Sequence, residues 1–229
     1  MSLSPPEAIV LAGGAGTRLR GVLPDTPKVL APIGGRPFLH RLLDDLARQG
    51  IEEVVLATGY AADAVEASAR DWNGPMHSRF SRETAPLGTG GAIANAFDAI
   101  RGSRAWVMNG DSFCDVDLRE VATEAAAAPE EPWLVAVEVD DASRFGTLEL
   151  EGARVVRYLE KTGRVERGWI NAGIYILPRA LMTRGAYSIE RDRFPQWAAG
   201  GYLRAARVRG RFIDIGTPES FAAAEAFFG

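Results

Sequence analysis

A glycine-rich run directly after a short apolar stretch constrains this chain more than any other feature of its sequence. The run covers residues 11–19 and reads LAGGAGTRL, and the apolar residues Ala8 to Leu11 are typical of a buried strand. Because glycine has no Cβ, successive backbone N–H groups in such a loop can turn toward one anion. Arg18 adds a guanidinium whose planar fork matches phosphate oxygens. The run therefore predicts a strand followed by a phosphate-binding loop, with a plain strand-to-helix turn as the alternative.

Two well-known phosphate-binding motifs do not fit these residues. A Walker A loop requires Lys and then Ser or Thr after its last glycine, whereas Thr17 and Arg18 follow Gly16 here. The dinucleotide-binding fingerprint requires a third glycine where Leu19 stands, followed by a second strand. Residues 24–28 instead read PDTPK, and a central strand excludes such prolines. We therefore exclude a P-loop and disfavour a nicotinamide-dependent dehydrogenase.

Composition limits the fold and the partners of the chain. It has 229 residues, of which 47% are hydrophobic, and this is enough for one sizeable core. The net charge of −4, without a run of Lys and Arg, argues against binding to a nucleic-acid polymer. No segment has the pattern of a signal peptide or the apolar length of a membrane span. With a single cysteine the chain cannot form an intrachain disulfide, so we expect a cytoplasmic protein that binds no membrane.

Strand-like and helix-like segments alternate in the first half of the chain and indicate an α/β fold with a parallel sheet. Strands are expected at 8–11, 53–58, 76–81 and 105–109, and helices at 37–49, 61–70, 90–100 and 117–128. From residue 133 onward, strands follow one another at 133–139, 146–150, 155–159, 170–177, 203–208 and 211–215. This second half predicts mixed or antiparallel pairing, with short helices at 178–182 and 190–199 and a closing helix at 218–228. We expect a single domain over residues 1–229.

Polar residues at the ends of predicted strands are the candidate ligand-binding residues, because ligands of open α/β sheets bind beyond the carboxyl ends of the strands. Asp111 follows the strand at 105–109, and Asp214 lies in the late strand at 211–215. Mg²⁺ usually takes one or two carboxylates together with phosphate oxygens and waters. These two carboxylates therefore predict a magnesium site beside the glycine loop, although either aspartate alone could be a turn or helix cap.

Other chemically reactive residues carry weaker signals. Lys28 lies between Pro27 and the apolar pair Val29-Leu30, and Lys161 follows the strand predicted at 155–159. Each is either a cation for an anionic ligand or an ordinary surface lysine. His40 and His77 have no carboxylate or cysteine at ligand spacing, so we assign both to packing or to the surface. Cys114 has no neighbouring histidine and is expected to be a small buried residue.

Seven short segments, spread over nearly the whole chain, carry the strongest family signal. In order they read LAGGAGTRL, TPKVLAPIGGRPFL, PLGTGGAI, NGDSF, LEK, INAGIYIL and FIDIGTPESF. In this order they resemble the sugar-1-phosphate nucleotidylyltransferases. Within that family the chain is most similar to the short bacterial D-glycero-D-manno-heptose 1-phosphate guanylyltransferases, and mannose-1-phosphate guanylyltransferases are similar too. One departure is Val29, where many relatives have proline.

This resemblance implies a Rossmann-like, mixed but mainly parallel sheet flanked by helices, as in nucleotide-diphospho-sugar transferases. It implies that a sugar 1-phosphate attacks the α-phosphorus of a nucleoside triphosphate with Mg²⁺ as the cofactor, for the synthesis of cell-envelope polysaccharide. The implied substrates are GTP and D-glycero-D-manno-heptose 1-phosphate. Mannose-1-phosphate guanylyl transfer, N-acetylmuramate-1-phosphate uridylyl transfer and a non-catalytic subunit that senses nucleotide sugars remain alternatives. A homodimer stays open, because the sequence does not decide the oligomeric state.

The resemblance also implies a role for individual residues. Arg18, Lys28 and Lys161 would act as cations on the reacting phosphates. The nucleotide would contact Leu11, Ala12, Gly13, Gly14, Gly16, Thr17, Gly88, Thr89, Gly90 and Asp111. The sugar would contact Asn109, Gly110, Glu160, Asn171, Ala172 and Gly173. Asp111 and Asp214 would hold the metal ion.

Overall fold

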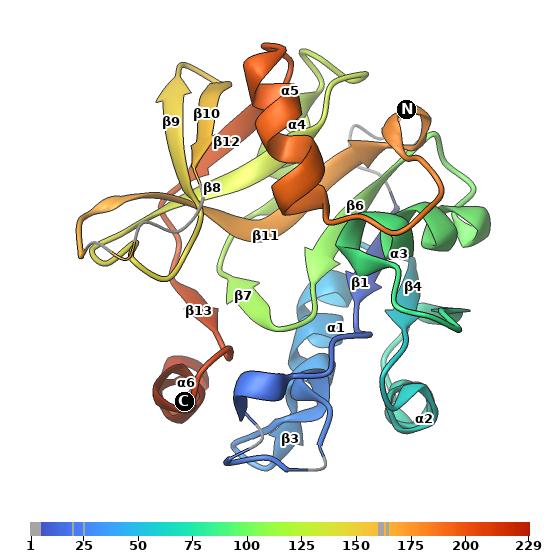
Figure 1. Ribbon diagram of the computed structural model, residues 1–229. Helices are drawn as coiled ribbons and strands as arrows, with labels where there is room; N and C mark the ends of the chain where they lie inside the picture. The colour runs from blue at the N-terminus through green and yellow to red at the C-terminus, as the bar shows by residue number, and fades with distance from the viewer. Residues whose placement is uncertain (1–5, 20, 25, 160–162, 164) are drawn as a thin grey trace.

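A mixed sheet forms the centre of the molecule. The computed structural model describes residues 6–229 except 20, 25, 160–162 and 164. In this part of the chain the sheet has nine strands (Figure 1). In spatial order they are β5 (His77–Arg82), β4 (Glu53–Thr58), β1 (Glu7–Leu11), β6 (Arg104–Asn109), β11 (Gly168–Pro178), β8 (Trp133–Val139), β12 (Arg204–Val208), β10 (Arg154–Leu159) and β9 (Thr147–Glu151).

The direction of the strands changes between the two halves of the sheet. β1 pairs in parallel with β4 and β6, and β4 pairs in parallel with β5. β11 is antiparallel to both β6 and β8, whereas β12 is parallel to β8. The prediction of a mixed sheet is therefore confirmed, with parallel pairing predominant only in the first half.

Helices cover both faces of the sheet, as predicted. The strand β1 shows why, because Ala8, Ile9 and Val10 are all fully buried and successive side chains point to opposite faces. Ala8 and Val10 belong to one hydrophobic cluster with side chains of α1 (Phe38–Arg48), α2 (Ala62–Asp71), α4 (Leu118–Ala125) and α6 (Pro218–Phe228). Ile9 belongs to a second cluster with side chains of α3 (Gly88–Ala96) and α5 (Phe194–Ala199). The alternating side chains of β1 thus contribute to two hydrophobic cores, one on each face of the sheet.

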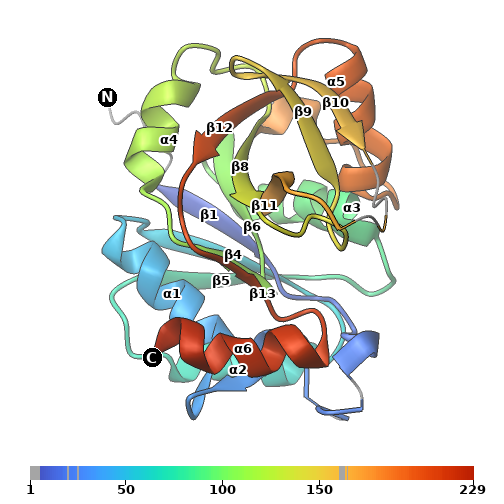
Figure 2. The same ribbon diagram turned by 90° about the vertical axis from the view of Figure 1, so that its left-hand side faces the viewer.

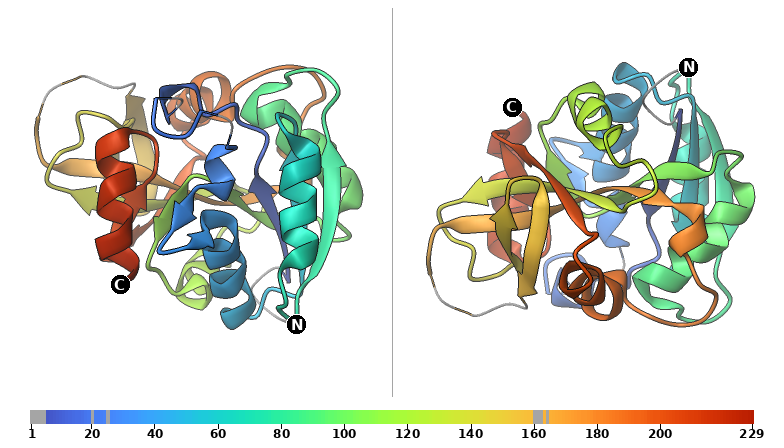
Figure 3. Two further views of the ribbon diagram at one scale, coloured as in Figure 1. Left: turned by 90° about the horizontal axis from the view of Figure 1, so that it is seen from below. Right: turned by 90° about the horizontal axis from the view of Figure 1, so that it is seen from above.

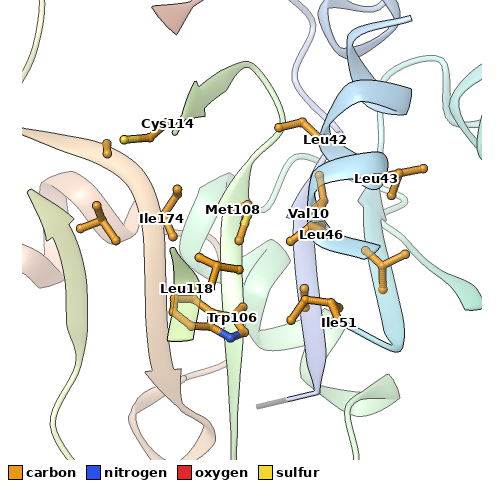
Figure 4. Close-up of a cluster of buried hydrophobic side chains, with 14 of the residues drawn as sticks. Val10, Leu42, Leu43, Leu46, Ile51, Trp106, Met108, Cys114, Leu118 and Ile174 are labelled. Atoms are coloured by element: carbon orange, nitrogen blue, oxygen red, sulfur yellow. The ribbon is translucent and has the colours of Figure 1, made fainter. Parts of the chain in front are cut away.

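The views of the molecule show the same division. In Figure 2, α2 and α6 lie below β4 and β5, α1 lies at the left of these strands, and α3 and α5 lie above them. Seen from below, α6, α1 and α2 are spread from left to right across the face turned to the viewer (Figure 3, left). The close-up in Figure 4 shows Leu42, Leu43 and Leu46 of α1 beside Val10 of β1. These leucines recur at helical spacing, so one face of α1 is apolar and is buried against the sheet.

Two strands outside the central sheet matter for the site. β7 (Ser112–Cys114) and β13 (Phe212–Asp214) form an antiparallel ribbon in which Asp214 is the partner of Ser112. We expected Asp214 at the end of a strand of the central sheet, and this expectation was wrong. β7 follows β6 closely in the chain, so the ribbon lies near the end of β6. The Ile215 N–H donates to the Asp111 carbonyl at 2.9 Å. The fold therefore brings the C-terminal segment to the end of β6 by a separate pairing. A second short ribbon joins β2 (Pro32–Ile33) to β3 (Arg36–Pro37).

Most predicted elements are present, with differences at their ends. The strands at 53–58 and 133–139 and the helix at 218–228 have the expected bounds. The helix expected at 90–100 begins at Gly88 and changes to a 3₁₀ turn at Phe97–Ala99. The segments expected as short helices at 178–182 and 190–199 are a 3₁₀ turn at Arg179–Leu181 and a π-helical turn at Ile189–Arg193 that leads into α5. In the described part of the chain, we find no helix with the length and apolar character needed to cross a membrane.

Candidate active site

A cavity of about 690 Å³ lies beyond the carboxyl ends of β1, β4 and β6. The register pairs Leu11 at the end of β1 with Ala57 on one side and Asn109 on the other, so the segments that follow these strands share one edge of the sheet. Lining residues come from the glycine loop, the turn around Lys28, the ends of β4 and β5, the start of α3 and the end of β6. They are Leu11, Ala12, Gly13, Gly14, Ala15, Gly16, Lys28, Val29, Ala57, Gly59, Tyr60, Glu83, Thr84, Ala85, Pro86, Gly88, Thr89, Ala92, Asn109, Gly110 and Asp111.

The glycine loop forms one wall of this cavity, and two of the glycines there are required by geometry. Gly16 has a φ of +57°, and a Cβ at this position would lie 3.2 Å from the Cβ of Lys28. Gly110 donates its N–H to the Leu11 carbonyl, and a Cβ there would lie 2.3 Å from that carbonyl oxygen. The chain is therefore in close backbone contact where β1 and β6 end, and the wall of the cavity is mainly main chain.

Arg18 lies at the rim of the site. It belongs to the 3₁₀ turn Thr17–Leu19, which is anchored by the buried side chain of Leu19 and by the Leu19 N–H donating to Gly16. The Arg18 side chain is exposed and does not line the cavity. The guanidinium therefore sits next to the glycine loop without facing into the cavity.

Lys28 and Asp111 form an ion pair at the mouth of the cavity. The Lys28 Nζ lies 2.7 Å from the Asp111 Oδ2, and the Lys28 side chain is only 16% exposed. The 3₁₀ turn Lys28–Leu30 holds the lysine in place, because the side chain of Val29 is buried in the core. The ammonium thus has a fixed position beside the glycine loop, where an anionic ligand would meet it.

Asp214 lies beside this ion pair. A Cβ on Gly216 would lie 2.4 Å from the Asp214 Oδ2 and 3.6 Å from the Lys28 Nζ, so both groups approach the same small volume. Asp214 accepts hydrogen bonds from the Gly216 N–H at 2.9 Å and from Arg144 at 2.9 and 3.0 Å. The β7–β13 ribbon therefore brings together Asp111 and Asp214, which are 103 residues apart.

These two carboxylates have the chemistry of a magnesium site. Each of them contacts a cation of the chain within 3.0 Å, which marks the position as one where positive charge is favourable. In the part of the chain that the structure describes, no group of three or more His, Cys, Asp or Glu is arranged to hold a metal. Mg²⁺ needs only one or two protein carboxylates when phosphate oxygens complete its coordination. The residues present therefore fit that ion better than a metal held by protein alone.

Comparison with known proteins identifies the family. Residues 7–228 match the family described as Nucleotidyl transferase. The chain is 34% identical, over 94% of its length, to a D-glycero-alpha-D-manno-heptose 1-phosphate guanylyltransferase of Campylobacter jejuni, of which it covers 96%. The chain belongs to the nucleotidyl transferase family. It is also 37% identical to a mannose-1-phosphate guanylyltransferase of Mycobacterium tuberculosis, of which it covers 65%. The crystal structure of HddC from Yersinia pseudotuberculosis superposes with a TM-score of 0.87 and 36% identity, covering 97% of this chain and 99% of that one.

In the segment PLGTGGAI of this nucleotidyl transferase, some residues line the cavity and others do not. Gly88 and Thr89 line the cavity, as expected for residues near a nucleobase. Gly90 instead packs against Tyr187, whose ring a Cβ would approach to 2.0 Å, and does not line the cavity. The Thr89 hydroxyl donates to Glu190 at 2.5 Å and accepts the N–H of Ile189 at 3.0 Å. The start of α3 is thus fixed to residues far along the chain.

The predicted sugar-contacting residues of the nucleotidyl transferase fall into two groups. Asn109 and Gly110 line the cavity, whereas Asn171, Ala172 and Gly173 lie on β11 and do not line it. The Asn171 amide donates to the hydroxyls of Tyr175 at 2.9 Å and Tyr158 at 3.2 Å, and its oxygen accepts the Gly173 N–H. Burial raises the pKa of Tyr175 well above its ordinary value, so this hydroxyl is neutral. The Asn171 side chain is therefore held by the chain's own groups.

Several predictions fall outside the site or outside the described residues. His40 contacts the carbonyl oxygen of Ser68 at 2.9 Å, and Cys114 is buried, with a pKa raised to about 12 by burial and by nearby carboxylates. Their assignment to ordinary packing is confirmed. The side chain of Thr17 and the residues Glu160 and Lys161 lie outside the part of the chain that the structure describes. Their proposed roles stay predictions.

Sequence reasoning did not assign several residues that line the cavity, among them Tyr60 and Glu83. Tyr60 follows β4, and its backbone N–H donates to the Gly13 carbonyl at 3.1 Å. Glu83 follows β5, and its carboxylate accepts the Leu87 N–H at 3.1 Å and lies close to Gly59 and Gly13. Both residues lie two positions after the end of a predicted strand, as Asp111 does, so the rule that selected Asp111 would also have selected them.

Proposed function

We propose that this nucleotidyl transferase moves a guanylyl group from GTP to the phosphate of a heptose 1-phosphate and releases pyrophosphate. The observation that carries the proposal is that Lys28 and Asp111 line the cavity together with the glycine loop, while Asp214 lies beside this ion pair. Such a site suits the polyphosphate of a nucleotide and a divalent cation. The guanylyltransferases from Campylobacter jejuni and Aneurinibacillus thermoaerophilus, which are 34% and 35% identical to this chain, support the choice of reaction.

Glu83 supports guanine as the base. An ionised carboxylate only accepts hydrogen bonds, and the edge of guanine offers the adjacent N1–H and N2–H donors. Uracil and thymine offer one N–H between two carbonyl oxygens, which a carboxylate would repel. Because the Glu83 carboxylate lies beside the cavity wall at Gly13 and Gly59, it favours GTP over UTP. A structure of the related HddC is described as complexed with GMP-PN, which is consistent with this choice.

The proposed reaction needs no nucleophile from the protein. An oxygen of the sugar phosphate forms a bond to the α-phosphorus, the bond from that phosphorus to the bridging oxygen breaks, and the electron pair leaves with pyrophosphate. The glycine loop would hold the triphosphate through backbone N–H groups, and Lys28 would neutralise it. Arg18 and Lys161 are proposed to assist at the rim and at the sugar phosphate. Asp111 and Asp214 would hold Mg²⁺, which when bound reduces the repulsion between the two anionic substrates.

The identity of the sugar is the finer part of the proposal. Two relatives whose own length the chain covers almost completely, 96% of each, are named as heptose enzymes, whereas the chain covers 65% of the mycobacterial mannose enzyme. Mannose 1-phosphate is the second candidate, because of the 37% identity to the mycobacterial mannose-1-phosphate guanylyltransferase. Glu83 disfavours the uridylyl alternative. A single domain over 1–229, a cytoplasmic location and a homodimer remain predictions.

A matrix of substrates tests this proposal. Pyrophosphate release is measured with Mg²⁺ for GTP, UTP, dTTP and ATP, each with heptose 1-phosphate, mannose 1-phosphate and N-acetylmuramate 1-phosphate. We expect GTP with heptose 1-phosphate to give the highest kcat/KM. Fastest turnover with UTP would contradict the choice of base, and binding of nucleotide sugar without turnover would indicate a sensor.

Two variants then test the residues. Asp111→Asn should lower kcat/KM at least about 100-fold, since removing one electrostatic contributor to the transition state costs about 3 kcal/mol. Asp115→Asn is the matched control, because Asp115 is 55% exposed and pairs only loosely with Arg211 at 3.7 Å. It should keep near-normal activity. Equal activity of both variants would refute the role of Asp111.

A further inference from the structure

Asp214 is bound by a cation of the chain that the proposed reaction does not use. The Nη2 atom of Arg144 donates to both carboxylate oxygens of Asp214, at 3.0 and 2.9 Å. The same atom lies 3.5 Å from the hydroxyl of Ser220 at the start of α6. Likewise, Lys28 forms an ion pair with Asp111. Each of the two proposed metal ligands therefore has its own cation from the protein.

The contact between Arg144 and Asp214 is built into the fold. Arg144 lies in the connection between β8 and β9, where the Phe145 N–H closes a turn onto the Ala142 carbonyl and Ala142 is buried. The ring of Phe145 packs edge-on against Phe212, two residues before Asp214 on β13, with a centroid distance of 5.5 Å. This packing places Arg144 next to Asp214. The Arg144 side chain is still 39% exposed, so water and ions can reach the pair.

A divalent ion on Asp214 is opposed by the charge of Arg144, which already occupies this carboxylate. The guanidinium uses both carboxylate oxygens, and an ion such as Mg²⁺ binds a carboxylate oxygen at about 2.0–2.1 Å. Two cations that share one carboxylate repel each other strongly when they are this close and partly shielded from water. We infer that Arg144 is the resident counter-ion of Asp214 and competes with the divalent ion for this carboxylate. This inference rests on the metal site of the proposed function.

The competition has a structural consequence. When the metal ion takes the Asp214 oxygens, the Arg144 guanidinium loses its carboxylate partner and turns away from β13. Among the described residues, the connection at 140–146 then keeps the packing of Phe145, the buried Ala142 with its N–H bonded to the Glu166 carbonyl, and the hydrogen bonds of its own turn, but loses the ion pair. Metal binding therefore loosens this connection and at the same time places a divalent cation in the site.

Binding of Mn²⁺ to the nucleotide-free protein, measured by titration calorimetry, tests the inference without an activity readout. Arg144→Gln should bind Mn²⁺ about fivefold more tightly than the wild type, because a partly exposed ion pair no longer competes. Arg184→Gln removes the same charge from an exposed pair with Asp98 and should bind Mn²⁺ like the wild type. Asp214→Asn should weaken binding in every background. If Arg144 only oriented Asp214, its loss would weaken Mn²⁺ binding, which is the opposite sign.

Hydrogen exchange of the backbone amides at 142–146 is the second readout. Mn²⁺ should speed exchange there in the wild type, and in Arg144→Gln exchange should already be fast without metal. If Arg144→Gln is unfolded by circular dichroism, Arg144→Lys decides, and it should bind Mn²⁺ at least about twofold more tightly than the wild type. Unchanged or weaker binding by the folded variant overturns the inference alone. A wild type that binds no Mn²⁺, either without nucleotide or with a saturating non-hydrolysable GTP analogue, overturns it together with the proposed metal site.

Discussion

At the residue scale, Glu83 determines which hydrogen-bond donors the cavity can accept. Glu83→Gln keeps an oxygen for the Leu87 N–H but replaces half of the acceptor edge by a donor. We expect kcat/KM for GTP to fall about 10- to 100-fold, since a hydrogen bond to a charged group contributes about 1.5–3 kcal/mol. The ratio of GTP to UTP turnover should fall as well. Glu120→Gln, at an exposed position of α4, is the control. An unchanged ratio in Glu83→Gln would show that Glu83 does not contact the base.

The residues of the site differ in how far sequence alone could place them. Gly16 and Asp111 follow predicted strands, and Lys28 stands between Pro27 and the buried Val29. The structure brings all three residues to the cavity. Gly90 and Asn171 also belong to segments that resemble the family. However, Gly90 packs against Tyr187, and Asn171 donates hydrogen bonds to two tyrosine hydroxyls. Sequence shows which residues follow a strand, but not which polar groups the chain itself will use. That depends on partners far away in the sequence.

At the scale of elements, the start of α3 depends on a hydroxyl that joins it to residues 188–190. Thr89→Val removes this hydroxyl at nearly equal volume and leaves the buried Ile189 N–H without its acceptor. We expect the free energy of unfolding to fall by about 1–3 kcal/mol and the KM for the nucleotide to rise, because Thr89 lines the cavity. Urea denaturation and initial rates measure the two effects. Thr123→Val, which removes an exposed hydroxyl from α4, should change neither one, and equal effects of the two variants would contradict the role of Thr89.

The docking of α2 onto β4 and β5 predicts a pH dependence. Glu66 of α2 accepts hydrogen bonds from Arg82 at 2.9 Å, Thr58 at 3.2 Å and Arg70 at 3.2 Å. The Arg82 bond is the main reason why the pKa of Glu66 lies below its ordinary value of 4.5. Folding therefore favours the ionised carboxylate, so its contribution is complete above about pH 4.5 and is lost as the pH falls through the lowered pKa.

Glu66→Gln tests this dependence. At pH 7 the variant should lose about 1–2 kcal/mol of unfolding free energy, and near pH 3 the difference from the wild type should shrink. Urea denaturation at the two pH values measures it, with Glu52→Gln at an exposed position as the control. A difference that stays constant between the two pH values would mean that Glu66 acts through its shape and not its charge.

Elements with a long apolar pattern could be predicted, and short ones that depend on distant partners could not. The strand at 133–139 has the predicted bounds because it is an almost continuous apolar run, and the helix at 218–228 because Pro218 marks its first turn. β7 and β13 have three residues each, too few for a period, and pair across about 100 positions. Sequence therefore predicted a strand around Asp214 but assigned it to the wrong sheet.

At the scale of the whole molecule, the cavity joins segments that must fold together. Its walls come from the ends of β1, β4 and β6 and from α3, while α3 is tied to residue 190 and the β7–β13 ribbon carries Asp214 to Asp111. Both halves of the sheet share β11, which pairs with β6 on one side and β8 on the other. We therefore expect the chain to unfold in one cooperative transition, as one domain over residues 1–229.

GTP with Mg²⁺ should raise the midpoint of this single transition. At a ligand concentration 100-fold above Kd, binding to the folded state adds about 2.7 kcal/mol. For a domain of this size that corresponds to a rise in Tm of about 5–10 °C, which calorimetry measures directly. UTP should produce a smaller rise, and Asp214→Asn should lose the part of the rise that depends on Mg²⁺. A second transition that the ligand does not move would show that the strands beyond β11 unfold separately, and the single-domain prediction would then be wrong.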